Sequence, residues 1–233
     1  MMSVKEAIIL AGGSGTRLQS VVSDVPKPMA LIGQTPFLEI LIERFHQKGI
    51  EHFIISTGYK ADIIRSHFAN KYTDIKISFS HEKQPLGTGG GIKLAMQKVI
   101  GDDVIVMNGD TLFDVDLTTL NRFIPCKYPV IFGRQVDDVS SYGHFVLDGE
   151  ILTQYKEKEG HGSGLINGGV YLLPKIAFDH FDEGRNFSIE KDYFMTLTNN
   201  NPARVILAYD FFIDIGLPET YELAQKILPD HLQ

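Results

Sequence analysis

The chain has 233 residues, of which 43% are hydrophobic and 22% charged, an ordinary composition for one globular α/β domain. Its formal charge of −7 argues against a broad nucleic-acid-binding surface. The single cysteine, Cys126, excludes an intrachain disulfide and fits a reducing compartment. No run of about 18 apolar residues predicts a membrane span. We therefore expect a cytoplasmic protein that binds neither nucleic acid nor membrane.

Short apolar strands alternate with amphipathic helices in the first half of the chain. Strands are predicted at residues 6–11, 52–57, 75–80 and 103–108, and helices at 36–49, 60–71 and 89–100. Continuous apolar strands separated by helices are typical of a parallel sheet that is covered on both faces. The sequence thus predicts the α/β class, with a three-layer α/β/α Rossmann-like architecture and a mostly parallel central sheet.

The second half is less regular. Strands are predicted at residues 128–136, 143–149, 167–174, 204–209 and 211–216, and helices at 188–200 and 218–231. Ser188 is a suitable N-cap for the first of these helices, and Asp116 lies near the start of another helical turn. No linker or repeat interrupts the chain, so we expect one domain, residues 1–233, with functional halves at 1–110 and 111–233.

A glycine-rich loop follows the first strand. Successive N–H groups in such a loop can bind phosphate oxygens, because ligands in open α/β sheets bind beyond the carboxyl ends of the strands. Arg17 can fork onto phosphate oxygens, and Lys27, held between Pro26 and Pro28, supplies a point charge. Taken alone, the glycines fit a plain turn equally well. The loop GGSGTRLQ matches neither the P-loop, which needs a lysine after the last glycine, nor G-x-G-x-x-G, which needs a glycine where Leu18 stands.

The segments LAGGSGTRL and PKPM together resemble the signature of the sugar-phosphate nucleotidyltransferases. The resemblance continues through PLGTGGG, NGD, EK, NGGVYL and DIG, and so covers nearly the whole chain. It implies that a nucleoside triphosphate and a sugar 1-phosphate combine to give a nucleotide sugar and pyrophosphate. PLGTGGGIK and INGGVYLL look most like the heptose 1-phosphate guanylyltransferases of this family, with mannose-1-phosphate guanylyltransferases and N-acetylmuramate- or hexose-1-phosphate uridylyltransferases as alternatives.

The resemblance assigns a role to most polar residues of the first half. Arg17 would hold the leaving end of the triphosphate, and Lys27 and Asp110 would act at the reacting phosphates. The expected nucleotide-binding residues are Leu10, Ala11, Gly12, Gly13, Ser14, Gly15, Thr16, Glu82, Gly87 and Thr88.

A magnesium site is expected at two aspartates. Asp110 follows a buried strand directly, and Asp214 lies in FFIDIG. Mg²⁺ binds oxygen ligands, usually one or two carboxylates together with substrate phosphates. An aspartate after a strand is more often a turn or helix cap, and it is the resemblance that assigns both positions to Mg²⁺.

Glu82 indicates which base the nucleoside triphosphate carries. A carboxylate can accept hydrogen bonds from N1–H and N2–H₂ of guanine together, whereas the carbonyls of uracil and thymine would repel it. Glu82 therefore favours GTP, with a solvated charge beside Lys83 as the equally weighted alternative.

The second substrate is expected in the second half of the chain. The resemblance implies that six residues line the sugar-phosphate pocket: Gly143, Glu157, Lys158, Asn167, Gly168 and Glu190. Without it, the KEKE run that contains Glu157 and Lys158 would be taken as a solvated charge run. His81 and His161 receive no role.

Two further function classes stay open on the sequence. A nucleotide-sugar sensor without activity is disfavoured by the joint presence of the basic and acidic residues named above. An NAD-dependent oxidoreductase is disfavoured by the missing third glycine. The expected partners are GTP, or another nucleoside triphosphate, and a sugar 1-phosphate, and a homo-oligomer is compatible with the sequence.

Overall fold

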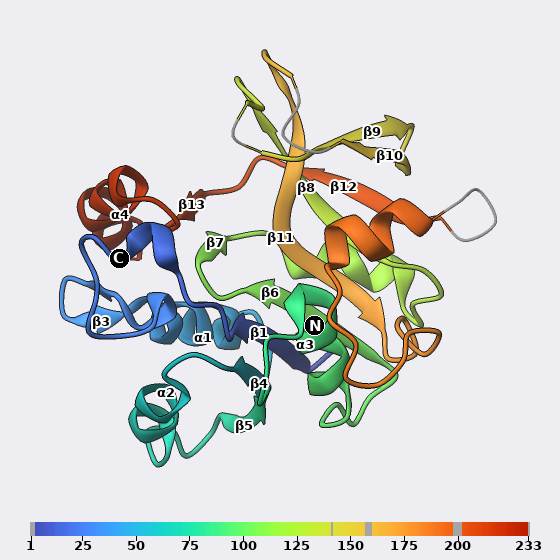
Figure 1. Cartoon of the computed structure of the whole chain (residues 1–233). Coiled ribbons are helices and arrows are strands. Elements are labelled where there is room, and N and C mark those ends of the chain that lie inside the picture. Colours follow the sequence, from blue (N-terminus) through green and yellow to red (C-terminus); the bar gives the residue numbers. More distant parts are fainter. Residues whose placement is uncertain (1–2, 141, 157–159, 198–201, 233) are drawn as a thin grey trace.

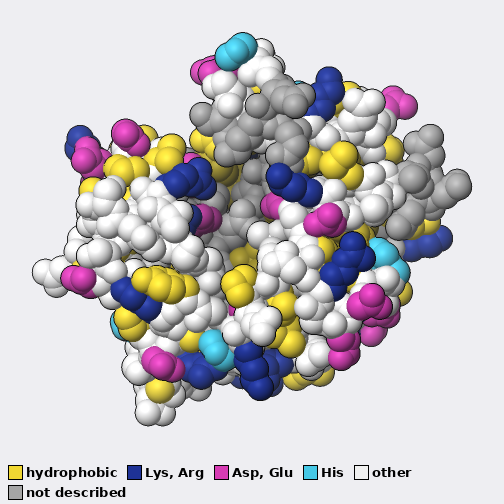
Figure 2. All heavy atoms as spheres, viewed as in Figure 1, with side chains coloured by type: hydrophobic (Ala, Val, Ile, Leu, Met, Phe, Trp, Pro, Cys, Tyr) yellow, Lys and Arg dark blue, Asp and Glu magenta, His cyan; other side chains and the backbone are white. Residues whose placement is uncertain are grey.

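A nine-stranded sheet runs through both halves of the chain in the order β5-β4-β1-β6-β11-β8-β12-β10-β9 (Figure 1). The computed structural model describes residues 3–140, 142–156, 160–197 and 202–232. None of the helices in these ranges is long and apolar enough to cross a membrane. On the face shown in Figure 2, basic and acidic side chains are interspersed, without a broad basic area.

The first half forms the parallel part of the sheet. Its strands and the helices between them are β1 (Glu6–Ala11), α1 (Phe37–Gln47), β4 (His52–Thr57), α2 (Ala61–Phe68), β5 (Lys76–His81), α3 (Gly87–Met96) and β6 (Asp103–Asn108). Strand β1 pairs in parallel with β4 and β6, and β4 with β5. The carboxyl ends of these strands therefore lie at one edge of the sheet.

The second half makes the sheet mixed. Its strands are β8 (Val130–Val136), β9 (His144–Asp148), β10 (Ile151–Lys156), β11 (Gly164–Pro174) and β12 (Arg204–Ala208). Strand β11 joins the halves by pairing antiparallel with both β6 and β8, while β8 and β12 pair in parallel. The predicted α/β class is confirmed, but the central sheet is mixed rather than mostly parallel, because the strands of the second half pair largely antiparallel. The sequence did not predict β10, because ILTQYK lacks the continuous apolar run of a central strand.

The remaining elements are short, apart from the closing helix α4 (Pro218–His231). They are the strands β2 (Leu31–Ile32), β3 (Thr35–Pro36), β7 (Thr111–Phe113) and β13 (Phe212–Asp214), and the turns η1 (Thr16–Leu18), η2 (Lys27–Met29), η3 (Leu117–Phe123), η4 (Ile189–Tyr193) and η5 (Phe194–Thr196). The helix predicted at 188–200 is thus a π turn followed by a 3₁₀ turn within its described residues. Ser188 accepts hydrogen bonds from the N–H groups of Glu190 and Lys191, which confirms it as an N-cap. Asp116 caps η3 through Thr118.

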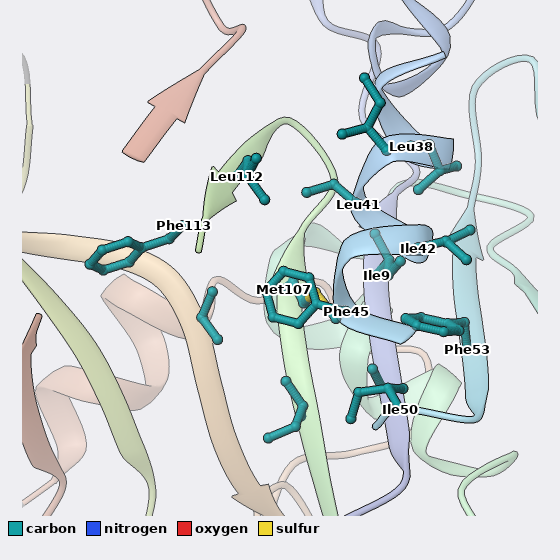
Figure 3. Packing of buried hydrophobic residues seen from close by; sticks show 14 of the residues in the cluster. Ile9, Leu38, Leu41, Ile42, Phe45, Ile50, Phe53, Met107, Leu112 and Phe113 are labelled. Carbon is teal, nitrogen blue, oxygen red and sulfur yellow. The ribbon is translucent and has the colours of Figure 1, made fainter. Parts of the chain in front are cut away.

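Each face of the sheet is covered by its own hydrophobic core. The side chains of Ile8 and Ile9, adjacent in β1, belong to opposite cores, as the alternation of a strand requires. Helices α1, α2 and α4 cover the face of Ile9, and α3 with η4 and η5 covers the face of Ile8. Figure 3 shows Leu38, Leu41 and Phe45 of α1 packed towards β1 and β6. This is the predicted three-layer arrangement.

Candidate active site

A cavity of about 860 Å³ opens at the carboxyl ends of β1, β4, β5 and β6. Its size suits a nucleotide. The sequence-predicted residues that line it are Leu10, Ala11, Gly12, Gly13, Ser14, Gly15, Lys27, Glu82, Gly87, Thr88, Asp110 and Glu190. The predicted nucleotide residues therefore share one cavity, apart from Thr16, which lies beside it in η1.

Lys27 and Asp110 form an ion pair inside this cavity, with 2.5 Å between Lys27 Nζ and Asp110 Oδ2. The two side chains are only 14% and 29% exposed. Gly15 has a φ of 60° and a Cβ added there would lie 2.8 Å from the Cβ of Lys27. A glycine at position 15 thus permits both the left-handed backbone and the close approach of the proline-held lysine.

Asp214 is brought next to Asp110 by a two-stranded ribbon. Strand β13 pairs antiparallel with β7, so that Asp214 lies opposite Thr111, and the N–H of Ile215 donates to the carbonyl of Asp110 at 2.9 Å. Oδ1 of Asp214 accepts a hydrogen bond from the N–H of Gly216 at 2.9 Å. Two aspartates distant in sequence therefore have adjacent backbones, and a Cβ on Gly216 would lie 2.9 Å from Asp214 Oδ1 and 4.0 Å from Lys27 Nζ, which places Asp214 near Lys27.

Arg17 is exposed in η1 and does not line the cavity. Its charge acts on Tyr142. Burial and the charge of Asp214 raise the pKa of Tyr142, and the charge of Arg17 opposes this shift. Arg17 and Asp214 thus both lie near Tyr142. Lys27 and Asp110 are therefore paired in the cavity lining and Asp214 is joined to Asp110 by backbone pairing, while Arg17 lies outside the cavity lining.

The ribbon that carries the aspartates is fixed at its far end by Asp114, which is 7% exposed. Its carboxylate accepts from Arg44 Nε at 2.9 Å, pairs with Lys48 Nζ at 2.9 Å, and lies 2.8 Å from His231 Nε2 of α4. Burial would raise the pKa of Asp114, but Arg44, Lys48 and His231 lower it to about 2. Helices α1 and α4 thereby hold β7 in place.

Glu82, at the end of β5, is folded against the glycine loop. Its Oε2 accepts from the N–H of Leu86 at 2.9 Å, and any Cβ at Gly12 would overlap its Oε1. Burial raises the pKa of Glu82, and the Leu86 N–H opposes part of that shift. To accept two hydrogen bonds from guanine, as predicted, Glu82 would use Oε1 for one of them. It would have to share Oε2 between the base and the N–H of Leu86.

Asn167 lies on β11 near the junction of the two halves. Its Nδ2 donates to the hydroxyl of Tyr171 at 2.6 Å and its Oδ1 accepts from the N–H of Gly169 at 2.9 Å. Tyr171 is fully buried, and burial raises its pKa, followed by the charge of Glu190. Asn167 and Glu190 therefore lie on the same side of the sheet, around Tyr171.

The other predicted sugar-phosphate residues have different surroundings. A Cβ at Gly143 would overlap the hydroxyl of Tyr155, and one at Gly168 would overlap the ring of Phe113 in the core. The glycine at 168 is therefore accounted for by core packing. Glu157 and Lys158 lie outside the described residues.

Sequence reasoning missed several residues of the site. Tyr142 and Tyr171 stand beside predicted residues, and further side chains and backbone line the cavity: Ser56, Gly58, Tyr59, Asn108 and Gly109, with Lys83, Gln84 and Pro85. Ser56 and Asn108 could have been found, because polar residues at the carboxyl ends of buried strands face the ligand edge of an α/β sheet. Nothing in the sequence around Tyr171 indicated a role for it, because only the fold brings its hydroxyl next to Asn167.

Residues 6–230 match the protein family described as "Nucleotidyl transferase". The chain is 40% identical over 229 residues to D-glycero-alpha-D-manno-heptose 1-phosphate guanylyltransferase of Aneurinibacillus thermoaerophilus, covering 97% of this chain and 100% of that protein. It is 41% identical to the protein of the same name from Campylobacter jejuni, covering 93% and 96% of the two chains.

Solved structures show the same similarity. HddC from Yersinia pseudotuberculosis, solved also as a complex with GMP-PN, superimposes on the chain with a TM-score of 0.86, 37% sequence identity, and coverage of 97% and 100%. A putative glucose-1-phosphate thymidylyltransferase from Bacillus anthracis, at a TM-score of 0.81, 18% identity and coverage of 97% and 95%, shares the fold.

Proposed function

Because the chain belongs to the nucleotidyl transferase family, we propose that it transfers the guanylyl group of GTP to D-glycero-α-D-manno-heptose 1-phosphate, giving GDP-heptose and pyrophosphate. The full-length similarity to two proteins named for that reaction supports this choice of sugar. The GMP-PN complex of HddC supports a guanine nucleotide.

One observation carries the proposal: Lys27 and Asp110 form an ion pair in the lining of a nucleotide-sized cavity, and strand pairing brings Asp214, from a third segment, beside Asp110. A triphosphate and a phosphorylated sugar repel each other, so a transferase must neutralise both where they meet. Lys27 supplies a cation there, and Asp110 with the neighbouring Asp214 supplies two carboxylates.

In the proposed reaction, an oxygen of the sugar phosphate attacks the α-phosphorus of GTP. A new P–O bond forms, the bond from the α-phosphorus to the bridging oxygen breaks, and pyrophosphate leaves. Lys27 offsets the charge that develops on the α-phosphate oxygens, and Arg17 stabilises the pyrophosphate. No protein nucleophile is needed, because positioning and electrostatic stabilisation supply most of the catalysis of phosphoryl transfer.

The donor set fits a magnesium ion. Asp110 and Asp214 supply hard carboxylate oxygens, and no cluster of three or more metal-binding side chains occurs among the residues that the structure describes. Such a site is typical of Mg²⁺, which completes its shell with substrate phosphates and water. Asp110 and Asp214 would hold the ion, whose charge would offset that of the phosphate oxygens, and Lys27 would hold Asp110 in orientation.

Each half of the chain binds one of the two substrates in this proposal. Residues 1–110 bind the nucleotide, with Glu82 accepting from guanine, and residues 111–233 bind the sugar phosphate. In the second half, Asn167 and Glu190 contact the sugar, Gly143 and Gly168 border it, and Lys158 with Glu157 binds its phosphate and hydroxyls.

The test is a matrix of the four nucleoside triphosphates against heptose, mannose, glucose and N-acetylhexosamine 1-phosphates, read by pyrophosphate release with Mg²⁺. We expect the highest kcat/KM for GTP with heptose 1-phosphate. A higher value for mannose 1-phosphate or UTP would reassign the substrates within the family. No release with any pair, despite binding of GTP, would indicate a nucleotide-sugar sensor.

A further inference from the structure

The order of the strands decides on which side of the reacting phosphates a base can lie. The strands run β5-β4-β1-β6-β11, so β1 and β6 separate the ends of β4 and β5 from β11 (Figure 1). Asp110 follows β6 and pairs with Lys27, and Asn167, a proposed sugar residue, lies on β11. In the proposed complex the base therefore extends the other way, towards β4 and β5. Their ends lie about 10 Å and about 14 Å from that of β6 at the ordinary spacing of neighbouring strands.

Tyr59 stands at that end of the cavity, two residues beyond the last residue of β4. Its N–H donates to the carbonyl of Gly12 at 3.1 Å, which fixes the backbone of Tyr59 against the glycine loop. A Cβ at the preceding Gly58 would lie 2.8 Å from the carbonyl oxygen of Gly12 and 3.2 Å from Cγ of Glu82. Tyr59 therefore lies close to Glu82, the residue proposed to accept hydrogen bonds from the base.

The Tyr59 side chain lines the cavity without being part of a hydrophobic core. It is 38% exposed and belongs to neither of the two cores that cover the sheet. Among the described residues that line the cavity it is the only phenylalanine or tyrosine, and the chain has no tryptophan. The other aromatic ring of this lining, the imidazole of His81, offers less area for stacking. An exposed aromatic ring in the wall of a ligand cavity is accounted for by a ligand rather than by packing.

Lys60 restrains the ring of Tyr59. The backbone of Lys60 is left-handed, with a φ of 50°, and its Nζ donates to the carbonyl of Ser23 at 2.6 Å. The same Nζ lies over the Tyr59 ring, 5.3 Å from the ring centroid, which is an attractive cation–π contact. A base would therefore meet a ring that is already held in place, and this lowers the entropy cost of binding.

We propose that the Tyr59 ring is the platform on which the base of the nucleotide stacks, so that Tyr59 contacts the face of the base and Glu82 its edge. The inference rests on the proposed function, which makes a nucleoside triphosphate the substrate. Loss of an aromatic platform typically weakens the binding of a base by about five-fold or more. Stacking does not depend on the donors and acceptors at the base edge, but a purine offers a larger face than a pyrimidine. Tyr59 thus adds to the affinity for GTP and favours purine over pyrimidine nucleotides.

The absence of tryptophan from the chain allows a direct test of the stacking. Tyr59→Trp keeps an aromatic platform and introduces a single tryptophan, whose fluorescence a stacked guanine quenches. We expect GTP with Mg²⁺ to quench this fluorescence strongly at saturation, and inorganic tripolyphosphate, which has no base, to leave it unchanged. Tyr209→Trp is the matched control, since Tyr209 is 77% exposed and does not line the cavity. Its fluorescence should respond to neither compound.

Affinities measured by calorimetry on the full chain complete the test. Tyr59→Ala should raise the Kd of GTP by at least about five-fold and leave that of tripolyphosphate unchanged, whereas Tyr59→Phe keeps the ring and should restore the Kd of GTP. The melting temperature of each variant checks its folding.

Three outcomes would overturn the proposal: an unchanged Kd of GTP in Tyr59→Ala, an equal loss of affinity for GTP and tripolyphosphate, or no quenching in Tyr59→Trp although calorimetry shows that GTP is bound. Pyrophosphate release is assayed separately. Turnover without these signs of stacking removes only this inference, whereas stacking without turnover removes the proposed function and leaves Tyr59 as the base platform.

Discussion

Lys27 illustrates how one residue connects sequence, fold and chemistry. Two prolines fix its backbone, a left-handed glycine lets it approach the signature loop, and Asp110 orients its ammonium group. A methionine would keep most of its packing and remove its charge. The same cation that is held in the free protein is thus available to the α-phosphate of a bound nucleotide.

We predict that Lys27→Met lowers kcat by at least about 100-fold, because removing one preorganised electrostatic donor costs about that much. The measurement is pyrophosphate release at saturating substrates, with the melting temperature as the check on folding. Lys226→Met, an exposed change on α4, is the matched control and should keep wild-type kcat. A Lys27→Met enzyme with near-normal kcat would show that Lys27 does not act at the reacting phosphates.

Glu82 carries a prediction about base choice and pH. One oxygen of Glu82 already accepts a hydrogen bond from the N–H of Leu86, so its contact with the base should be weaker than a full two-point contact. We therefore expect Glu82→Gln to reduce the preference for GTP over UTP by about five-fold, the low end for a base-edge contact. Burial raises the pKa of Glu82, so protonation should weaken GTP binding at a pH where an exposed glutamate is still ionised. The ratio of kcat/KM values for GTP and UTP, measured at several pH values, checks both effects. An unchanged ratio would mean that other groups read the base.

At the scale of elements, the β7–β13 ribbon decides where the carboxylates lie. Asp110 and Asp214 sit at one end of the ribbon and Asp114 at the other, so the ion pairs of Asp114 with α1 and α4 fix both. Phe211, which precedes β13, stacks on His231 of α4 at 3.8 Å between ring centroids and strengthens the same junction.

We predict that Asp114→Asn lowers the free energy of unfolding by roughly 3 kcal/mol, because it removes a buried carboxylate and leaves the partly buried Arg44 and Lys48 without their counter-charge. The native pKa of about 2 lies below the ordinary value of 3.8, so ionised Asp114 contributes about 2 kcal/mol above pH 4. This contribution is lost as the pH falls through about 2. Urea unfolding at several pH values checks it.

The control for that experiment is Asp116→Asn, which alters an exposed cap on the same segment and should cost less than about 1 kcal/mol. If Asp114→Asn unfolds at the same urea concentration as the wild type, the ion pairs of Asp114 do not stabilise the ribbon.

At the scale of the whole molecule, the cavity is lined mainly by residues of the first half of the chain, and among the described residues Glu190 adds a contribution from the second half. A ligand bound there contacts the ends of the parallel strands together with the η4 turn. Binding to the folded state alone should therefore stabilise the protein as a unit.

We predict that GTP with Mg²⁺, at 100 times its Kd, adds about 2.7 kcal/mol of stability and raises the melting temperature by about 5–10 °C. Chelation of divalent metal should abolish turnover and reduce this shift, while leaving the melting temperature of the free protein unchanged. A shift that is identical with and without metal would argue against a metal bridge between the aspartates and the nucleotide.

Local patterns in the sequence were sufficient for much of the fold. The apolar runs at 6–11, 52–57 and 103–108 are the strands β1, β4 and β6, because buried parallel strands leave a continuous apolar signature. The amphipathic pattern at 218–231 is α4. Most of the motif residues predicted to bind the nucleotide line one cavity, since they follow strand ends and so reach one edge of the sheet.

Only the tertiary structure decided three features. These are the antiparallel partners in the second half, the pairing of Asp214 with Thr111, and the hydrogen bonds between residues 86–90 and Phe187. The glycines of PLGTGGG show the difference: their spacing identified a ligand loop, but their close contact with residues 185–187 is visible only in the fold. Periodicity reports which face of an element is buried, because burial repeats along the chain. It does not report which distant segment covers that face, since that choice depends on packing between parts that are far apart in sequence.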